Sequence, residues 1–168
     1  MFYNPALFDF TREFERNWQA IRDEYYQLDR HIANIHRNQP HEAYLKTFLH
    51  DNAWMPSWQV NSKKPNHNWL TYGLSYQGLL PSEAQEKFPS IAALLTRLSG
   101  FKVCAFSRME KFSFIAPHKH EELGGNLLTY HLGIDVVPGK NHLWVDKSLK
   151  NSVMASQLFL MAHTSILP

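Results

Sequence analysis

The fold is decided by residues 102–146, which read KVCAFSRMEKFSFIAPHKHEELGGNLLTYHLGIDVVPGKNHLWVD. Apolar and polar residues alternate through much of this stretch, and that alternation is typical of strands that bury one face. Glycine and proline pairs separate the alternating segments and predict turns between them. We therefore expect four strands, at residues 102–109, 112–116, 127–136 and 142–146.

Upstream of these strands the hydrophobic pattern changes to the period of a helix. Residues 11–37 carry a single apolar stripe, formed by Ile21, Tyr25, Leu28, Ile32 and Ile35. Thr11 precedes two acidic residues and stands where a side-chain N-cap is expected. The pattern predicts one helix that packs its stripe on a sheet.

Two shorter helices are expected before the strands. One covers residues 41–50. The other covers residues 82–98, with Ser82 as its N-cap or Pro89 as its first residue, and it ends at Gly100.

The remaining upstream residues are divided by composition. Residues 51–69 contain two prolines and four asparagines and predict a loop, whereas residues 70–76 (LTYGLSY) predict a strand. Helices that precede strands indicate an α+β domain, with the helices covering an antiparallel sheet or barrel. We expect a single domain over residues 1–168, with a mainly helical support region at 1–100, a β core at 101–150 and an atypical tail at 151–168.

Composition and charge exclude several classes of protein. The net charge is only +2 and the basic residues are scattered, which argues against nucleic acid as a partner. No apolar run approaches the length of a membrane span, and Met1–Phe10 lacks the basic start of a signal peptide. The single cysteine, Cys104, lies in an apolar segment and predicts a buried thiol in a reducing compartment. We therefore expect a cytoplasmic protein.

Histidines gather in and near the predicted strands. His118 and His120 fall on one face of an extended segment, and His131 lies opposite the apolar face of its own strand, beside Thr129. Neutral imidazole is a common metal ligand, so the cluster indicates a divalent metal site. A structural role for each histidine is the competing interpretation, because the chain has 10 histidines and an H-x-H pair arises easily by chance.

Four short motifs, in the order in which they occur along the chain, resemble those of a known family. They are AFSRM at residues 105–109, IAPH at 115–118, HLGI at 131–134 and VPG at 137–139. Together they resemble the signature of the aspartyl/asparaginyl β-hydroxylase family of iron- and 2-oxoglutarate-dependent dioxygenases. The resemblance extends over residues 88–146 and implies N-terminal helices packed on a double-stranded β-helix, a jelly-roll and cupin-like core.

The resemblance also implies roles for individual residues. His118 matches the first iron ligand of a family that uses two histidines and no carboxylate, and His163 is the candidate for the second. Ser107, Met109 and His131 match the contacts to the cosubstrate, 2-oxoglutarate. The activity implied is hydroxylation of a carbon in a peptidyl, lipid or small-molecule substrate.

This chain departs from the family pattern at two places. Thr129 stands where the family has an arginine, two residues before His131. Residues 151–168 read NSVMASQLFLMAHTSILP and lack the F-D step, the histidine spacing and the final arginine of the family. Written in permissible codons and read one frame over, this tail can regain an F-D step and a later histidine. We therefore hypothesise a frameshifted or truncated relative of a longer enzyme, with a β-helix that is incomplete at its C-terminal side.

Two other functions compete with the dioxygenase. A metal-binding cupin would use His118, His120, Glu122 and His142, although this glutamate follows the histidines sooner than in cupins. A non-catalytic jelly-roll binding module would keep the fold without the metal.

Overall fold

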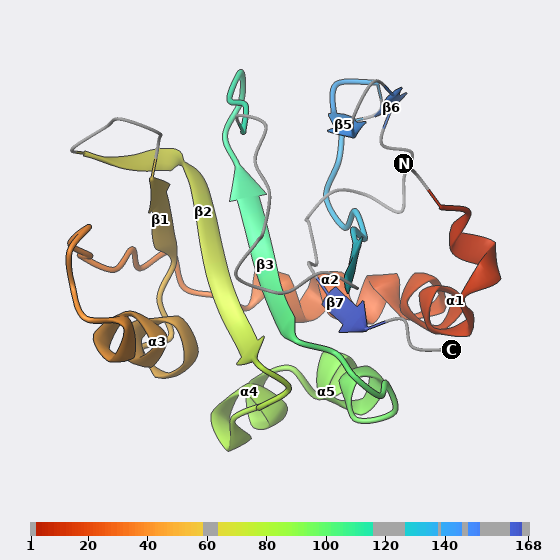
Figure 1. Ribbon diagram of the computed structural model, residues 1–168, viewed down its shortest axis with the longest axis horizontal. Coiled ribbons are helices and arrows are strands. Elements are labelled where there is room, and N and C mark those ends of the chain that lie inside the picture. Colours follow the sequence, from red (N-terminus) through yellow and green to blue (C-terminus); the bar gives the residue numbers. More distant parts are fainter. Residues whose placement is uncertain are drawn as a thin grey trace.

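The computed structural model describes residues 3–58, 64–115, 127–137, 139–145, 148–151 and 162–165. Its centre is an antiparallel sheet of three strands in the order β1-β2-β3, and helices flank it (Figure 1). The strands are β1 (Met55–Trp58), β2 (Pro65–Tyr76) and β3 (Val103–Met109). The helices are η1 (Pro5–Leu7), α1 (Asp9–Arg16), α2 (Trp18–Tyr26), α3 (His41–His50), α4 (Ser82–Lys87) and α5 (Pro89–Leu95).

The later part of the chain adds two antiparallel pairs of short strands. Strand β4 (Leu127–Tyr130) pairs with β7 (Ala162–Ser165), and β5 (His142–Val145) pairs with β6 (Ser148–Asn151). The α+β class is therefore confirmed. The described strands form one three-stranded sheet and two pairs, and they do not close into the jelly roll that the family resemblance implies.

The two faces of the central sheet are covered by different helices. On one face, Leu74 of β2 and Phe106 of β3 are buried in the main core with residues of α1, α2, α4 and α5. On the other face, Ala105 and Met55 are buried with Phe48 of α3. Burial on both faces explains why β2 and β3 contain apolar residues at consecutive positions.

Helix α3 approaches the sheet closely because β2 has a glycine at the contact. A Cβ atom added at Gly73 would lie 2.2 Å from the backbone oxygen of Phe48. The hydrogen atom of glycine is thus what allows the helix backbone to lie directly against the strand.

The predicted helix at residues 11–37 is wrong in length and continuity. It is two helices, α1 and α2, separated at Asn17. The side-chain amide of Asn17 donates a hydrogen bond of 2.8 Å to the backbone oxygen of Glu13, and this competes with helix continuation. After Tyr26 the chain extends to the sheet, where Ile32 forms a parallel bridge with Trp54.

Thr11 is not the N-cap that the pattern predicted. It lies inside α1 and is buried, and its hydroxyl is within 2.7 Å of the backbone oxygen of Pro5 and 2.8 Å of that of Phe8. Thr11 therefore ties α1 to the preceding turn instead of starting the helix.

The predicted loop at residues 51–69 is also wrong, since it contains β1 and the beginning of β2. Pro56 is compatible with β1 because β1 is an edge strand, where a missing N–H need not face a neighbour. The helix predicted at 41–50 and the strand predicted at 70–76 are confirmed, although the strand starts earlier, at Pro65.

The predicted helix at 82–98 is split into α4 and α5 at Phe88. Phe88 has φ −129° and ψ 62°, because the residue before a proline is disfavoured in the helical conformation. Pro89 is the first residue of α5, as one of the two interpretations expected, and Ser82 is the first residue of α4 rather than its cap. Gly100 has a left-handed φ of 76° in the turn before β3.

Two of the four predicted later strands differ from expectation. Residues 111–115 form a turn and coil, with Phe112 at φ 60°, so the described part of the 112–116 segment is not a strand. Strand β4 ends at Tyr130, although Leu132 and Ile134 keep the alternation and are buried in the core. The strands predicted at 102–109 and 142–146 are confirmed as β3 and β5.

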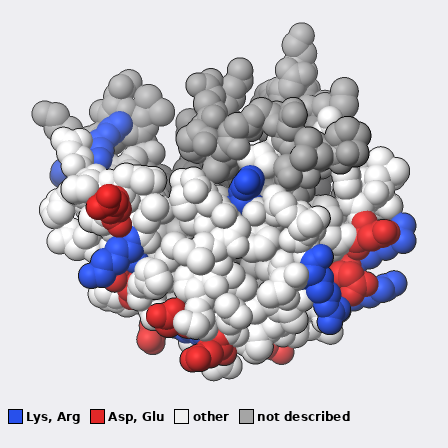
Figure 2. Space-filling model, turned by 60° about the horizontal axis from the view of Figure 1, so that its bottom comes forward, with Lys and Arg blue, Asp and Glu red and all other residues white. Residues whose placement is uncertain are grey.

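Charged side chains are distributed over the surface without a broad patch of one sign on the face shown in Figure 2. Several form local ion pairs, among them Arg16 with Glu13 at 2.8 Å and Arg12 with Asp9 at 3.7 Å in α1. The described helices are all too short or too polar to cross a lipid bilayer.

Candidate functional site

Strand β3 carries two of the residues that the sequence singled out. Ser107 pairs with Thr71 of β2, and Met109 pairs with Trp69. Ser107 is buried, with 4% of its surface exposed, and Met109 is half-buried. Because successive residues of a strand point to opposite faces, Ser107 and Met109 share a face.

Arg108 belongs to the opposite face of β3. Its guanidinium lies 5.9 Å from the centre of the Trp54 ring and forms an ion pair of 2.5 Å with Glu110. The ion pair holds the end of β3 where the chain turns at residues 110–113. The arrangement leaves the Ser107 and Met109 face without this charge.

The hydroxyl of Ser107 has a defined partner in β2. The indole Nε1 of Trp69 donates a hydrogen bond of 2.9 Å to Ser107 Oγ. An indole N–H can only donate, so Ser107 is the acceptor in this bond and keeps its own proton for another partner. A buried hydroxyl in this state can donate to a carboxylate.

His131 follows the last residue of β4 and is half-buried. Its neighbours in the chain, Tyr130 and Leu132, both pack in the main core. Leu132, which is buried, and Tyr130, which is half-buried, thus fix the backbone of His131 against the core. This anchoring fixes where the chain leaves β4.

His163 lies in β7, directly opposite Thr129 of β4. Strand β7 also contacts β3, so a segment near the end of the described chain touches both β3 and β4; Figure 1 shows β7 close to β3. Strand β7, which carries His163, is therefore a neighbour both of β3, which carries Ser107, and of β4, which His131 follows. This assembly could not be derived from the local sequence pattern, because β7 falls in the tail that was expected to be atypical.

Most of the other residues predicted to bind a metal are not among those that the structure describes. His118, His120 and Glu122 lie outside the described residues. His142 is exposed at the start of β5. Within the described ranges no three histidine, cysteine, aspartate or glutamate side chains gather into a metal site. The roles of His118 and His163 as iron ligands accordingly stay predictions.

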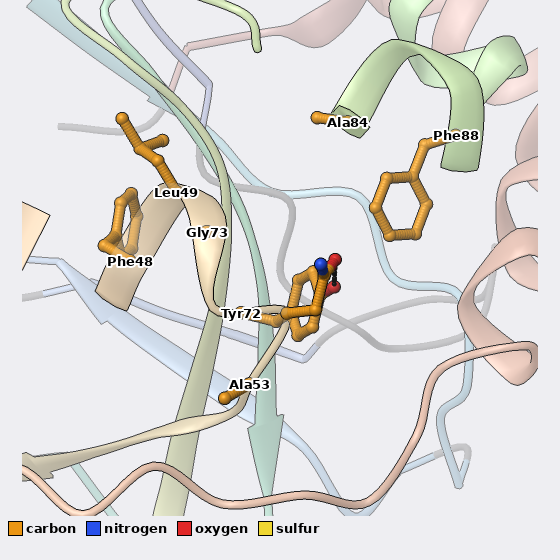
Figure 3. Close-up of a pocket in the computed structure, with 8 residues that line it drawn as sticks. Phe48, Leu49, Ala53, Tyr72, Gly73, Ala84 and Phe88 are labelled. Atoms are coloured by element: carbon orange, nitrogen blue, oxygen red, sulfur yellow. Dashed lines mark hydrogen bonds between the residues drawn. The ribbon is translucent and has the colours of Figure 1, made fainter. Parts of the chain in front are cut away.

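A second group of polar residues, which sequence reasoning did not identify, lies between α3, α4 and β2. Figure 3 shows a small pocket there, with a volume of about 10 Å³, lined by Phe48, Leu49, Asn52, Ala53, Tyr72, Gly73, Ala84 and Phe88. The volume admits about one water molecule. The pocket is therefore too small for an organic cosubstrate.

Two polar residues of the pocket, Tyr72 and Asn52, form a network with the neighbouring Lys87. The Tyr72 hydroxyl donates a hydrogen bond of 2.9 Å to Asn52 Oδ1 and accepts one of 3.2 Å from Lys87 Nζ. The pKa of Tyr72 is raised to about 12, mainly by burial and to a smaller extent by the negative charge of Asp29. Tyr72 therefore stays neutral at physiological pH and serves as a structural hydrogen-bond donor.

Burial also raises the pKa of the Cys104 thiol, which is wholly enclosed in the core. The reactive form of cysteine is the thiolate, so this shift suppresses nucleophilic reactivity. The expectation of a buried, inert thiol agrees with this environment.

The sheet and its flanking helices define an α+β protein, in which β7 contacts both β3, the strand of Ser107, and β4, the strand that His131 follows. The chain belongs to the aspartyl/asparaginyl β-hydroxylase family, whose model matches residues 15–164. The match includes α2, the central sheet and most of β7. A comparison with curated proteins found no match.

Proposed function

We propose that this chain is an Fe(II)- and 2-oxoglutarate-dependent hydroxylase that acts on a carbon of a peptidyl, lipid or small-molecule substrate. Membership of the aspartyl/asparaginyl β-hydroxylase family over residues 15–164 carries the proposal. That family typically uses Fe(II) and 2-oxoglutarate. The family also implies the double-stranded β-helix as the complete architecture.

The chemistry of the β3 face supports 2-oxoglutarate as the cosubstrate. Ser107 presents a buried hydroxyl that can donate a hydrogen bond to a carboxylate oxygen. Met109 lies on the same face and offers apolar surface to the methylene carbons of the cosubstrate. His131 is the candidate donor to the second carboxylate, from the end of β4.

His118 and His163 are the residues that would hold the iron. Imidazole nitrogen suits Fe(II), and two histidines leave coordination positions for other ligands. The pairing of β7 with β4, and its contact with β3, support His163 as the second of these ligands. When bound, the iron and 2-oxoglutarate supply the oxidising power for hydroxylation, while the chain orients the substrate and excludes water.

Thr129 makes the proposed site less basic than the family pattern. A threonine hydroxyl cannot form the bidentate, charged contact that an arginine makes with a carboxylate. Thr129 is exposed in β4, opposite His163. We expect this chain to bind 2-oxoglutarate more weakly than relatives with arginine at this position, and Thr129→Arg should tighten binding in calorimetry.

The proposed function is tested by supplying the purified chain with Fe(II), 2-oxoglutarate and oxygen and measuring succinate. The expected result is slow succinate formation that His118→Ala and His163→Ala abolish. His142→Ala is the matched control, since His142 is an exposed histidine on β5, which pairs with β6 and not with β3, β4 or β7.

Three outcomes separate the competing functions. Succinate that depends on His118 but not on His142 supports the hydroxylase. Metal binding without succinate, lost in both His118→Ala and His142→Ala, supports a cupin. Neither metal binding nor succinate supports a non-catalytic module and refutes the proposal.

The proposed setting is the cytoplasm. A chain with one cysteine forms no internal disulfide, which suits a reducing compartment where Fe(II) is also maintained. Fractionation of cells that express the tagged chain tests this, and recovery in a secreted or oxidising fraction contradicts it.

A further inference from the structure

Trp69 is the one side chain that contacts the proposed cosubstrate residue Ser107 through a hydrogen bond in the described part of the chain. It lies on β2 and is paired across the ladder with Met109, two positions from the Thr71–Ser107 pair. The bond of 2.9 Å joins adjacent strands of a sheet that is packed on both faces. Its geometry is therefore set by the ladder and not by a mobile loop.

The direction of this hydrogen bond determines what Ser107 can do. A serine hydroxyl carries one proton and two acceptor lone pairs, whereas an indole nitrogen carries a proton and no acceptor. Trp69 therefore occupies a lone pair of Ser107 and turns the hydroxyl proton away from itself. Among the described residues, none accepts that proton, although Ser107 is 4% exposed.

The bond from Trp69 also disfavours an alternative hydrogen bond of the Ser107 hydroxyl. Without a fixed partner, the hydroxyl rotates and donates to a nearby backbone carbonyl oxygen, as serine and threonine side chains commonly do. A ligand would then have to break that bond before it could accept the same proton. Fixing the rotamer in advance lowers the cost of ligand binding.

We propose that Trp69 is a positioning residue that holds the Ser107 hydroxyl oriented for donation to a carboxylate. The inference rests on the proposed function for the identity of that carboxylate as one of the two in 2-oxoglutarate. In this proposal Trp69 does not contact the ligand directly. All of its effect on binding passes through Ser107.

The test is a double-substitution cycle of Trp69→Phe, Ser107→Ala and the combined variant. Phenylalanine keeps most of the apolar ring and removes the N–H. The measured quantity is the Kd of 2-oxoglutarate by calorimetry, on protein supplied with Mn(II) instead of Fe(II) so that no turnover occurs. We expect Trp69→Phe to weaken binding about fivefold, the effect of one ordinary hydrogen bond. In the Ser107→Ala background the same substitution should have no effect.

A matched control uses Trp58, a half-buried tryptophan on β1 of the same sheet. Its ring lies beside Arg37, and no hydrogen bond of its indole occurs in the described ranges. Trp58→Phe should leave the Kd unchanged. Thermal unfolding of each variant, followed by circular dichroism, establishes that the sheet remains folded.

A spectroscopic measurement reports on the bond itself. The indole proton resonance of Trp69, assigned by its loss in Trp69→Phe, should move upfield in Ser107→Ala because the acceptor is gone. Addition of 2-oxoglutarate should shift it in the wild-type chain and leave it unchanged in Ser107→Ala.

The outcomes distinguish this inference from the proposed function. Equal weakening by Trp69→Phe in both backgrounds, or no weakening in the wild-type background, overturns the positioning role while the hydroxylase stands. No binding of 2-oxoglutarate to the wild-type chain overturns both. A Kd that changes equally in Trp58→Phe shows a general effect on the sheet and also overturns the positioning role.

Discussion

At the scale of single residues, Tyr72 shows how the described core accommodates polar groups. Its ring contacts Trp54 and Phe88 edge-on, while its hydroxyl reaches Asn52 and Lys87. Side chains of this type bury a large apolar body and still satisfy one polar atom. Tyr72 thereby connects β2 with α4, through Lys87, and with the segment that follows α3, through Asn52.

We predict that Tyr72 makes the stability of the fold fall at alkaline pH. An unfolded tyrosine ionises near its ordinary pKa of 10.0, whereas the folded group stays protonated until about pH 12. The unfolded state is therefore favoured increasingly as the pH rises through this window, by up to about 2 to 3 kcal/mol. Below pH 10 this contribution to stability is fully retained.

Urea unfolding of the wild-type chain and of Tyr72→Phe, at several pH values across that window, measures the difference. Tyr25, Tyr44 and Tyr130 also have pKa values raised by burial, but they contribute equally to both proteins. The wild-type chain should lose more free energy of unfolding than Tyr72→Phe. Parallel pH profiles would show that Tyr72 ionises freely in the folded state.

The residue pattern predicted part of the candidate site. Alternation placed Ser107 and Met109 on one face of β3, and the register agrees with this. Trp69 was not identified, because the prolines and asparagines around it indicated a loop. Its partner is 38 residues away in the sequence, and no local pattern reports a contact at that separation.

At the scale of elements, the contact between α3 and β2 depends on Gly73. We predict that Gly73→Ala lowers the free energy of unfolding by about 3 kcal/mol, since the added methyl group would overlap the Phe48 backbone oxygen at 2.2 Å. Backbone atoms cannot rotate away as a side chain can, so α3 must shift.

Gly139→Ala is the control for this substitution. A Cβ at Gly139 meets no atom within 4 Å, and its cost comes only from the φ of 71°. We expect about 1 kcal/mol for that backbone strain. Chemical denaturation of both variants checks the contrast, and equal losses would mean that crowding at Gly73 is relieved without moving α3.

The boundaries of elements were predicted less well than their presence. Within the apolar stripe predicted at residues 11–37, Ile21, Tyr25 and Leu28 pack in the main core. Ile35, however, belongs to the separate cluster with Phe48 and Met55, on the other face of the sheet. A periodic pattern cannot distinguish one long helix from two segments whose apolar residues are buried in different places.

At the scale of the whole molecule, the candidate site exists only when β3, β4 and β7 are assembled. A ligand that binds this assembly stabilises it against unfolding. We predict that Mn(II) with 2-oxoglutarate at about 100 times its Kd raises the free energy of unfolding by about 2.7 kcal/mol. Thermal scans with and without both additions measure this.

His163→Ala should abolish that stabilisation, and His142→Ala should preserve it. A rise of equal size in His163→Ala would remove His163 from the proposed metal site. Stabilisation by Mn(II) alone, without any further effect of 2-oxoglutarate, would separate metal binding from cosubstrate binding.

The sequence predicted the α+β class correctly because the change from helical to alternating periodicity occurs near Gly100. It did not predict β1, because Pro56 is as compatible with a loop as with an edge strand. The pairing of β4 with β7 was also missed, since residues 162–165 carry no distinctive alternation of their own. Tertiary pairing, rather than local preference, decides the conformation of such short strands.

The pairing of β4 with β7 has a consequence for synthesis on the ribosome. Helices α1 to α5 and the sheet β1-β2-β3 are encoded before residue 110, so they can assemble while translation continues. The ladder between β4 and β7 cannot form until Ala162–Ser165 has left the exit tunnel. The nascent chain therefore passes through a stage in which the helices and the sheet β1-β2-β3 are folded while β4 still lacks its partner strand. Chaperones that shield unpaired strands would act at that stage.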